Sequence, residues 1–464
     1  MVGAGKGRPR VGGGPFLCAS VFGAGLLRVG AHRPRFPNGP GRSAVWDCSA
    51  DLPPNVRESV PTSSTTADLP PPLTGGDPVT FVHHTITVRW PRIARRVIDD
   101  NALSTAAEER VRALVDDIPD GTIRPLDDPH APDEALWNEW IAPHRGQSWL
   151  ACPWFFGETY FYRRIMGAVG HYRPGPHRGL DPFSAQKAQG YTASADAIRT
   201  LAQARAEAAD DPLPRRALVR LLTTALWGNQ ADLSMWDADA EGPDHLGTGR
   251  AAEHLLTDDT GAALDHLEAC ASPVRVDVWA DNAGFELATD LALVDGLLTG
   301  GWADRVVLHV KAHPTFVSDA TAGDVHAALD RFAGDADEAT RALADRLRTA
   351  RARGRLRLAD PFTWTSPLPA RDFSTATTAE LARTDLLISK GDANYRRLLG
   401  DRPWPFTTAF GDVVDDLPAP LLALRTAKSE VMVGLTRAQV DRLNDEDPDW
   451  LVNGRWGVAQ FADA

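Results

Sequence analysis

The stretch Val274-Arg-Val-Asp-Val-Trp-Ala280 runs directly into Asp281-Asn282 and then into the segment Ala283-Gly-Phe-Glu286. The first seven residues predict a strand, and the spacing of apolar residues after Asn282 predicts an amphipathic helix. In an open α/β sheet, ligands bind where strands end at their carboxyl termini. Two oxygen-bearing side chains at that point can hold a hard divalent metal, and the adjacent helix N-terminus favours an anion. The stretch therefore indicates a phosphate site in outline.

Short apolar runs alternate with helical segments from residue 271 to the C-terminus. The runs predict strands over 274–280, 305–309, 355–358, 385–389 and 421–424, and the helices between them include 286–298 and 322–332. Alternation of this kind favours a mostly parallel, Rossmann-like sheet with helices on its faces. The expected fold class is therefore α/β, preceded by an all-helical lobe.

The residues before 271 carry the helical pattern of that lobe. Helices are expected over 134–141, 155–169, 193–209 and 215–226, and Thr105-x-x-Glu108 has the form of a capping box that begins another. Residues 1–77 are rich in Gly, Pro, Arg and Ser and contain too little apolar surface to offset the entropy of ordering. The expected domains are a disordered basic and Pro-rich tail and linker over 1–77, a helical lobe over 78–270 and an α/β domain over 271–464.

The net charge of −13 understates how acidic the body of the chain is. Residues 1–42 hold seven Lys or Arg and no acid, which leaves 42 basic and 62 acidic residues in the remainder. A body this acidic repels nucleic acid and anionic membranes, so neither is expected as a partner. A phosphorylated ligand must instead be bound by local groups or by a metal.

The four cysteines are typical of a reducing compartment. They show no metal-ligand spacing such as CxxC, and Cys152 and Cys270 are expected to be small buried hydrophobes. The apolar run at 16–27 follows basic residues as in a secretory signal, but glycines interrupt it and no convincing cleavage site follows. No apolar run reaches transmembrane length. A cytoplasmic protein is therefore expected, and residues 1–77 are interpreted as an unfolded extension or the product of an early start codon.

Polar clusters follow four of the predicted strands. They are Asp281-Asn282, the segment from Lys311 to Asp319, the run Ser389-Lys-Gly-Asp-Ala-Asn-Tyr-Arg-Arg397, and Arg425-Thr-Ala-Lys428. Each has an ordinary interpretation by itself, since Asp281 or Asp319 can be a helix cap and basic residues can be solvated surface. Independent caps are not expected to gather so many acids, amides and cations at one edge of one sheet. The joint pattern therefore favours a functional site.

These motifs resemble those of the damage-control metal-dependent phosphatases, a family long called a domain of unknown function. The resemblance rests on Asp281-Asn-Ala-Gly-Phe-Glu286, Phe316-Val-Ser-Asp319, Lys390-Gly-Asp-x-Asn-Tyr-Arg396 and the Arg-Thr-x-Lys of 425–428. Two signatures in the helical lobe agree, Trp154-x-x-x-Glu158-x-Tyr-x-Tyr162-Arg-Arg164 and Leu226-Trp-Gly-Asn229-x-x-Asp232-Leu-Ser234. The motifs occur in the family's order from about residue 80 to the C-terminus, and the Arg-Thr-x-Lys motif marks one subfamily. Animal members of the family have also been described as protein-glutamate carboxyl methyltransferases.

The resemblance implies a role for each matching residue. Asp281, Asn282 and Asp319 correspond to ligands of a divalent metal, with Mn²⁺ expected first and Co²⁺, Ni²⁺ or Mg²⁺ as alternatives. The positions that border the substrate are Asp281, Asn282, Asp319, Asp392, Ala393, Asn394, Tyr395, Arg396 and Lys428. Ala393 is smaller than the residue that relatives often carry, which changes the shape of the pocket and leaves its polar groups in place.

The chemistry of phosphate-ester hydrolysis is consistent with these roles. The reaction is extremely slow without a catalyst, so the site must neutralise charge and activate water. Lys428 and Arg396 are expected to neutralise phosphoryl oxygens, and Asp392 to orient water or protonate the leaving oxygen. The expected catalytic residues are Asp281, Asp319, Asp392 and Lys428. Direct attack by water and a covalent aspartyl route both remain open.

Three functions from different classes compete. A metal-dependent phosphatase acting on small phosphorylated metabolites, such as sugar phosphates of the fructose 1-phosphate kind, ranks first. An S-adenosylmethionine-dependent carboxyl methyltransferase needs a glycine-rich turn after its first strand, and this chain has Asp281-Asn282 there. A non-catalytic sugar-phosphate-binding protein is disfavoured because Asp281, Asn282, Asp319 and Lys428 are all present.

Several other residues are given structural interpretations. Trp137, Trp140, Trp149 and Trp154 are expected to pack in the core or between lobes. His83-His84 is expected at the surface or at a strand edge. Glu158, Arg163, Asn229 and Asp232 are interpreted first as hydrogen bonds between the lobes and second as pocket lining, and Glu286 as a residue behind the metal ligands.

Overall fold

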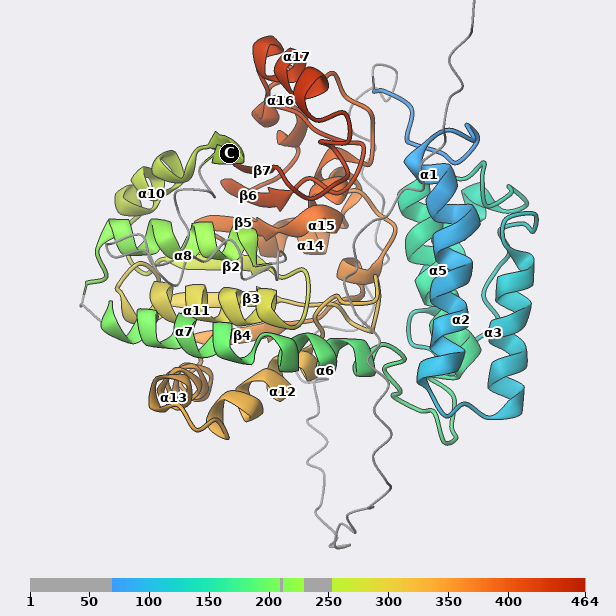
Figure 1. Ribbon diagram of the computed structural model, residues 1–464, viewed down its shortest axis with the longest axis horizontal. Helices are drawn as coiled ribbons and strands as arrows, with labels where there is room; N and C mark the ends of the chain where they lie inside the picture. The colour runs from blue at the N-terminus through green and yellow to red at the C-terminus, as the bar shows by residue number, and fades with distance from the viewer. Residues whose placement is uncertain (1–68, 209–211, 229–252, 464) are drawn as a thin grey trace, which may run out of the picture. The chain divides into compact units, whose positions relative to one another are not determined.

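A computed structural model describes residues 69–208, 212–228 and 253–463 (Figure 1). At its centre is a seven-stranded sheet with the order β1-β7-β6-β5-β2-β3-β4. Its strands are β1 (Leu255–Asp258), β2 (Arg275–Trp279), β3 (Arg305–His309), β4 (Leu356–Ala359), β5 (Leu386–Lys390), β6 (Leu421–Thr426) and β7 (Gly457–Ala462). The five predicted strands are all present, and β1 and β7 are additional.

The five predicted strands, β2 to β6, run parallel to one another. β7 is antiparallel to β6, and β1 pairs parallel with β7. The sheet is therefore mostly parallel, which confirms the predicted α/β fold class. The sequence does not reveal β1 because its four residues, Leu-Leu-Thr-Asp, are too few to show a period.

Successive residues of the central strands alternate between two apolar cores, as strand geometry requires. In β2, Val276 and Val278 face one core, and Trp279 faces the other. The first core is covered by α7 (Ala195–Glu207), α8 (Arg215–Trp227), α10 (Thr260–Ala269), α11 (Phe285–Thr299), α12 (Ala322–Ala333) and α13 (Glu338–Ala352). The second is covered by α14 (Thr375–Leu381), α15 (Gly391–Leu399), α16 (Phe410–Val414) and α17 (Arg437–Glu446). Figure 1 shows α8 and α11 side by side along the strands. The sheet is thus the middle of three layers.

A group of helices near the N-terminal end of the described chain has its own apolar core. Its elements are α1 (Phe81–His84), η2 (Thr85–Arg89), α2 (Trp90–Asp100), α3 (Thr105–Asp117), α4 (Glu134–Ile141), η3 (Ala142–His144) and α5 (Trp154–Val169). Figure 1 shows α2, α3 and α5 packed alongside one another. Trp137, Trp149 and Trp154 are buried in this core and Trp140 packs against it, as the sequence predicts.

The boundary expected at residue 270 does not separate the sheet from the helical lobe. α7, α8, β1 and α10 all precede residue 271. β1 nevertheless belongs to the sheet, α8 and α10 pack against it, and α7 packs on α11 and α13, which themselves contact the sheet. Helix periodicity identifies α7 and α8 as helices but says nothing of what their apolar faces cover. α6 (Ser184–Ala193) joins the two parts, and it ends where the single helix predicted over 193–209 begins.

The expected tail and linker is partly outside the described residues, which begin at 69. Within 69–77, the backbone N–H of Leu73 donates to the Asp401 carbonyl, and the Leu73 carbonyl accepts from Trp154 N–H. This segment therefore contacts both the helical lobe and α15, and is not a free linker.

Two local interpretations are wrong, and a third is confirmed in one of its two alternatives. The capping box does not form at Thr105, because Ser104 is the N-cap of α3 and Thr105 is its first helical residue. Asp319 is not a cap either, since Thr321 caps α12 and forms a capping box with Asp324. The surface alternative predicted for His83-His84 is confirmed at His84, which is an exposed residue of the short helix α1, and the strand-edge alternative is not.

Cysteine burial agrees with the sequence for one of the two described cysteines. Cys152 is buried, and burial raises the pKa of its thiol to about 12. Cys270 is only partly buried. Among the described helices, none combines the length and apolarity that a bilayer crossing requires.

Candidate metal and phosphate site

The order of the strands creates a crevice beside Asp281. From β2 the chain adds β3 and then β4 on one side, and it returns to add β5 on the other side of β2. A sheet whose strand order reverses in this way binds ligands at the carboxyl ends of the two strands that flank the reversal. Asp281 and Asn282 follow β2, and Gly391 follows β5, so the two predicted motifs meet at this point.

Gly391 is where the two motifs touch. Its φ of +83° lies in the left-handed region, and a Cβ added there would lie 1.9 Å from Oδ2 of Asp281. A side chain at 391 is therefore excluded both by the backbone conformation and by the Asp281 carboxylate. Because Gly391 has no side chain, helix α15 can begin in contact with the Asp281 carboxylate.

We expect Gly391→Ala to reduce both the stability of the fold and the activity of this site. The left-handed backbone alone costs a residue with a Cβ about 1–3 kcal/mol. The displaced Asp281 carboxylate should lower activity roughly a hundredfold, as misplacement by an ångström does in enzymes. Gly354→Ala is the matched control, because Gly354 has φ +69° and open space at its Cβ position. Urea unfolding should then show a loss in both variants, and activity should fall in Gly391→Ala alone.

Backbone hydrogen bonds join the Asp281 and Asp319 segments. Ala283 N–H donates to the Ser318 carbonyl and Ala320 N–H donates to the Asp281 carbonyl, each at 2.7 Å. The two segments thus form a short antiparallel bridge at Asn282 and Asp319. The structure therefore brings together the three residues predicted as metal ligands, although 37 positions separate Asn282 from Asp319 in the chain.

The turn before Asp319 has an unusual backbone that the helical lobe supports. Phe316 and Val317 have φ values of 49° and 70°, a conformation that a β-branched residue rarely adopts. The Phe316 ring packs against Tyr162 and Phe155 of α5, with centroids 5.3 and 6.1 Å apart. Left-handed residues cost about 1–3 kcal/mol each and persist where their surroundings hold them. The helical lobe thus helps to set the position of Asp319.

The Asn282 side chain is oriented from both ends. Its Nδ2 donates to Asp281 Oδ2 and to Glu286 Oε2, both at 2.8 Å. Its Oδ1 accepts a hydrogen bond from the Ser318 hydroxyl and retains a second lone pair. Glu286 therefore lies behind Asn282, as the sequence predicts.

The two predicted acidic ligands are buried with unsatisfied charge. Asp281 and Asp319 are 4% and 2% exposed, and neither Asp281 Oδ1 nor Asp319 Oδ2 has a hydrogen-bond partner. Burial, reinforced by Asp319 and Glu286, raises the pKa of Asp281 well above its ordinary value. Burial also raises the pKa of Asp319 to about 6, although Lys311 Nζ lies 3.3 Å from Asp319 Oδ2. Asp319 thus has one lysine as its ion-pair partner, whereas Asp281 forms no ion pair with a described residue.

A buried triad stands beside the pair. Lys390 Nζ lies 3.2 Å from Glu286 Oε1 and 2.9 Å from Asp290 Oδ1. Burial raises the pKa of Asp290 to about 6 in spite of this lysine, and Asp290 and Glu286 raise the pKa of Lys390 against the effect of its own burial. With two acids around one lysine, the triad adds to the negative potential at Asp281.

The donor set fits a hard divalent cation. Asp281 and Asp319 offer carboxylate oxygens without hydrogen-bond partners, and Asn282 offers an amide oxygen. Within the described ranges, no three His, Cys, Asp or Glu side chains form a metal-binding group. A site built here therefore depends on the amide of Asn282 and on ligands from substrate or water, as hard ions accept.

The Arg-Thr-x-Lys motif is fastened to Asp392. Oδ1 of Asp392 accepts from Arg425 Nε at 2.8 Å, Ser429 Oγ at 3.0 Å and Lys428 N–H at 3.2 Å. Arg425 is buried and lies 4.3 Å from the centre of the Tyr395 ring, whereas Lys428 is only half-buried. Asp392 thus positions the motif and leaves the Lys428 side chain at its edge.

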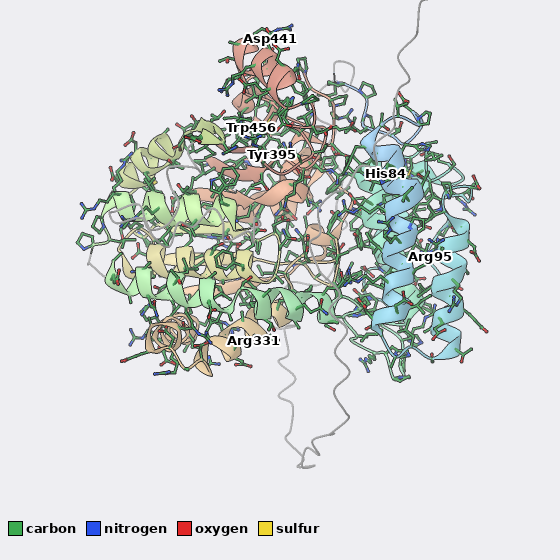
Figure 2. The ribbon with its side chains drawn as sticks, in the orientation of Figure 1. His84, Arg95, Arg331, Tyr395, Asp441 and Trp456 are labelled. Carbon is green, nitrogen blue, oxygen red and sulfur yellow. The ribbon has the colours of Figure 1, made fainter. Side chains whose placement is uncertain are left out.

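The run from Asp392 to Arg396, which the sequence analysis expects to border the substrate throughout, belongs to the first part of helix α15. Successive helical side chains point about 100° apart, so this run cannot line one surface together. Asn394 faces the site, where its Oδ1 accepts from Lys311 Nζ at 3.2 Å. The Tyr395 hydroxyl donates to Gln460 Oε1 in the core beside β6 (Figure 2). Ala393 is half-buried.

Arg396 joins α15 to the helical lobe. Its guanidinium pairs with Asp401 at 2.8 Å and with Glu158 of α5, and it lies 3.6 Å from the centre of the Trp154 ring. Both acids raise the pKa of Arg396 against the effect of burial. The predicted lobe-to-lobe role of Glu158 is therefore confirmed. The sequence predicts that Arg396 neutralises phosphoryl oxygens of the substrate. In the structure its positive charge is already paired with the carboxylates of Glu158 and Asp401.

The lobe-to-lobe hydrogen bond predicted for Arg163 is wrong, because Arg163 pairs with Asp133 and Asp128 inside the helical lobe. It lies five residues after Glu158 on α5 and therefore points to a different side of the helix. Asn229 and Asp232 lie outside the described residues.

Two lysines of the polar clusters were given no role of their own in the sequence analysis, although both lie in the site. Lys311 lies two residues after β3, and Lys390 is the last residue of β5. A lysine at the end of an apolar strand was the available signal for both. Asp290 was also missed, although it lies four residues after Glu286 in a helix that is otherwise mostly apolar.

Comparisons with known proteins agree with these observations. Residues 85–443 match the family model described as the damage-control phosphatase ARMT1-like domain. Damage-control phosphatase ARMT1 of Danio rerio is 32% identical over 427 residues, which cover 82% of this chain and 94% of that protein. The protein of the same name from Rattus norvegicus is 30% identical over 437 residues, covering 85% and 99%.

Among solved structures, a DUF89 family protein from Pyrococcus horikoshii aligns with 82% of this chain and 98% of its own, at 14% identity and a TM-score of 0.44. The family model spans more than half of the chain, and the relatives align over most of their own length. The resemblance inferred from the motifs is confirmed, and the chain belongs to the ARMT1-like damage-control phosphatase family.

Proposed function

We propose that this protein is a metal-dependent phosphatase that hydrolyses phosphate monoesters of small metabolites, with sugar phosphates of the fructose 1-phosphate kind as the substrate class. The observation that carries the proposal is the pair of buried carboxylates, Asp281 and Asp319: Asp281 Oδ1 has no hydrogen-bond partner, and Lys311 is the only described ion-pair partner of Asp319. Such a pair is costly by itself and becomes favourable when a cation lies beside it. Membership of a phosphatase family supports the same conclusion.

Asp281, Asn282 and Asp319 would hold the divalent cation, with Mn²⁺ favoured among Mn²⁺, Co²⁺, Ni²⁺ and Mg²⁺. When bound, the cation would supply charge neutralisation for a phosphoryl oxygen and a water of lowered pKa. Ser318 and Glu286 keep Asn282 in its orientation, and Gly391 allows α15 to approach without displacing Asp281.

The cationic residues of the chain complete the phosphate site. Lys311, held between Asp319 and Asn394, is buried at the same strand ends and would neutralise phosphoryl charge. Lys428 would act from the edge, where its backbone N–H is fixed to Asp392. Asp392, with three donors on one oxygen, is better suited to holding this motif than to exchanging a proton.

Phosphate release from a panel of sugar phosphates tests the proposal. The protein should be chelated and then supplied with Mn²⁺, Co²⁺, Ni²⁺ or Mg²⁺ in turn. Release that returns with a metal and is absent in Asp281→Ala would support it. Asp441→Ala is the matched control, since Asp441 is an acid on the exposed helix α17 that pairs with Arg437 (Figure 2). No release with any metal from a folded protein would contradict the proposal and favour a binding or methyltransferase role.

A further inference from the structure

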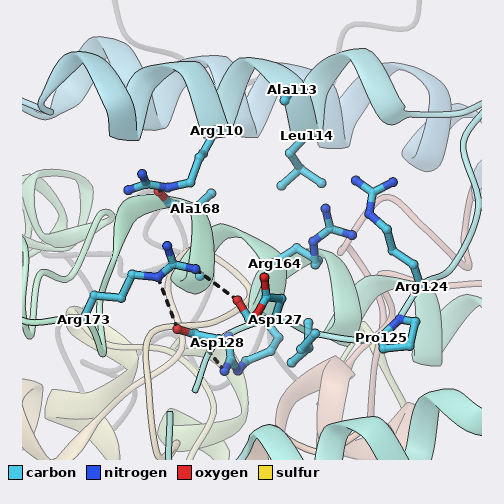
Figure 3. A pocket seen from close by; sticks show the side chains of 13 residues that line it. Arg110, Ala113, Leu114, Arg124, Pro125, Asp127, Asp128, Arg164, Ala168 and Arg173 are labelled. Carbon is cyan, nitrogen blue, oxygen red and sulfur yellow. Dashed lines mark hydrogen bonds and ion pairs between the residues drawn. The ribbon is translucent and has the colours of Figure 1, made fainter. Parts of the chain in front are cut away.

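The helical lobe contains a cavity of about 300 Å³ that shares no residue with the Asp281 site. Its walls come from α3, from the segment at 124–128, from α5 and from Arg173 just after α5 (Figure 3). Five of the lining residues are arginines, Arg110, Arg124, Arg163, Arg164 and Arg173, and two are acids, Asp127 and Asp128. Such an excess of arginine is notable in a chain whose body is strongly acidic.

Two of the arginines lack acidic partners within the described part of the chain. Arg110 Nε donates to the Ala168 carbonyl, and Arg164 donates to the Tyr160 hydroxyl and lies over its ring. Arg124 pairs with Asp117 at 3.0 Å, on an exposed edge. Arg110 and Arg164 therefore bring uncompensated charge to the cavity.

A third arginine is buried with a free donor. The Arg163 side chain is fully buried, and its other nitrogens bind Asp128 and Asp133. Its NH1 group has no hydrogen-bond partner. A buried guanidinium N–H without a partner is costly, so this group is suited to an acceptor from a ligand.

Gly167 keeps the cavity open beside that donor. It lies in the interior of α5, where glycine costs about 1 kcal/mol relative to alanine. A Cβ at this position would lie 3.6 Å from Arg163 NH1 and from Asp128 Oδ2, which is ordinary contact, so no clash excludes a side chain. A larger residue here would fill the space in front of Arg163.

The chemistry of the walls identifies the ligand class. Guanidinium groups match the geometry of phosphate oxygens with paired N–H donors. The volume is at the lower end of the range for small-molecule sites, about 300–1,000 Å³, and it matches a small anion better than an extended polyanion. Burial lowers the pKa of Arg110, and repulsion from Arg173 lowers it further. An anion between the two arginines relieves this repulsion.

We propose that this cavity binds a small phosphorylated anion, either a phosphate monoester or free phosphate, at a second site apart from the candidate catalytic centre. Arg110 and Arg164 supply the uncompensated charge, and Arg163 supplies a buried donor. Arg163 and Arg164 of the helical-lobe signature then serve this cavity, whereas Tyr162 packs against Phe316.

Calorimetric titration in EDTA tests the proposal, with inorganic phosphate and fructose 1-phosphate as probes. Without metal, the buried acids of the Asp281 site repel anions, so Asp281→Ala should bind the probes no more weakly than wild type. Arg110→Gln and Arg164→Gln should each weaken binding about tenfold or more, because each removes a charge-assisted hydrogen bond. Arg112→Gln is the matched control, since Arg112 is on the same helix α3 but exposed and paired with Glu108.

Gly167→Leu provides a test that leaves every arginine in place. It should abolish binding by filling the cavity, while circular dichroism confirms the fold. Fructose 1-phosphate binding at least tenfold tighter than phosphate would identify an ester site, and equal affinities would identify a site for free phosphate. The proposal is overturned if neither probe binds wild type, if Arg112→Gln weakens binding as much as Arg110→Gln and Arg164→Gln, or if Gly167→Leu binds normally.

Discussion

Asp281→Asn is expected to remove nearly all phosphatase activity and, at the same time, to make the metal-free protein more stable. Under the proposed function, activity should fall about a hundred- to a thousandfold, because the substitution would remove a charged metal ligand and part of the several kcal/mol of charge stabilisation that a bound metal would supply. Burial, the Asp319 carboxylate and the Glu286 carboxylate each raise the pKa of Asp281. The ionised Asp281 side chain therefore destabilises the fold, and removing its charge should raise stability. Neutralising a carboxylate whose pKa is raised by the fold regains about 1.4 kcal/mol for each unit of that increase.

The sign of the pH dependence follows from the raised pKa. A carboxyl whose folded pKa exceeds its unfolded value destabilises the fold when ionised, and the penalty disappears as pH falls below both values. The stability difference between Asp281→Asn and wild type should therefore be largest near pH 7 and shrink toward pH 4. Denaturant unfolding in EDTA at several pH values measures it.

Asp319→Asn is the informative comparison. It should also lose activity, but its gain in stability should be smaller, because it leaves Lys311 without the carboxylate 3.3 Å away. Adding Mn²⁺ should raise the melting temperature of wild type, since ligands stabilise the state that binds them, and should have little effect on either variant. An Asp281→Asn protein that is less stable than wild type in EDTA would show that Asp281 is not under electrostatic strain.

Arg396→Met is expected to cause the largest loss of stability among the changes considered. It leaves Glu158 and Asp401 buried without their cation, and breaking a buried ion pair from one side costs about 3–5 kcal/mol. The stacking of the guanidinium on Trp154 is lost as well. Urea unfolding should show the loss, whereas Arg437→Met, which breaks an exposed pair on α17, should show no measurable change.

A double-mutant cycle separates the structural role of Arg396 from a role in substrate binding. Glu158→Gln in the Arg396→Met background should recover part of the lost stability, because one unpaired acid is then neutral. Arg396→Lys keeps the charge and should retain more stability than Arg396→Met. If Arg396→Met unfolds like wild type and only KM rises, Arg396 acts on substrate and its ion pairs are incidental.

Local order was largely predictable from sequence. Strand β3 spans the predicted residues, and β2, β4, β5 and β6 differ from prediction by one or two residues at their ends, because β-branched and apolar runs in a parallel sheet are buried on both faces. The gathering of Asp281, Asn282 and Asp319 was predictable because the carboxyl ends of parallel strands meet at one edge of the sheet. Residues 69–77 were misassigned as linker because their hydrogen-bond partners are distant in the sequence. The start of α3 was misassigned because Ser104, directly before Thr105, takes the N-cap position.

The sequence by itself determined the fold class, the edge of the sheet where the site lies and the family, because these depend on local periodicity and on motifs that are short in the chain. Only the tertiary structure decided which side chains of each motif share a space. It directed Tyr395 to Gln460, Arg396 to Glu158 and Asp392 to Arg425, and it brought Lys311 to Asp319. The physical reason is that a helix turns each successive side chain by about 100°, so the contacts of a residue depend on what packs against its side of the helix.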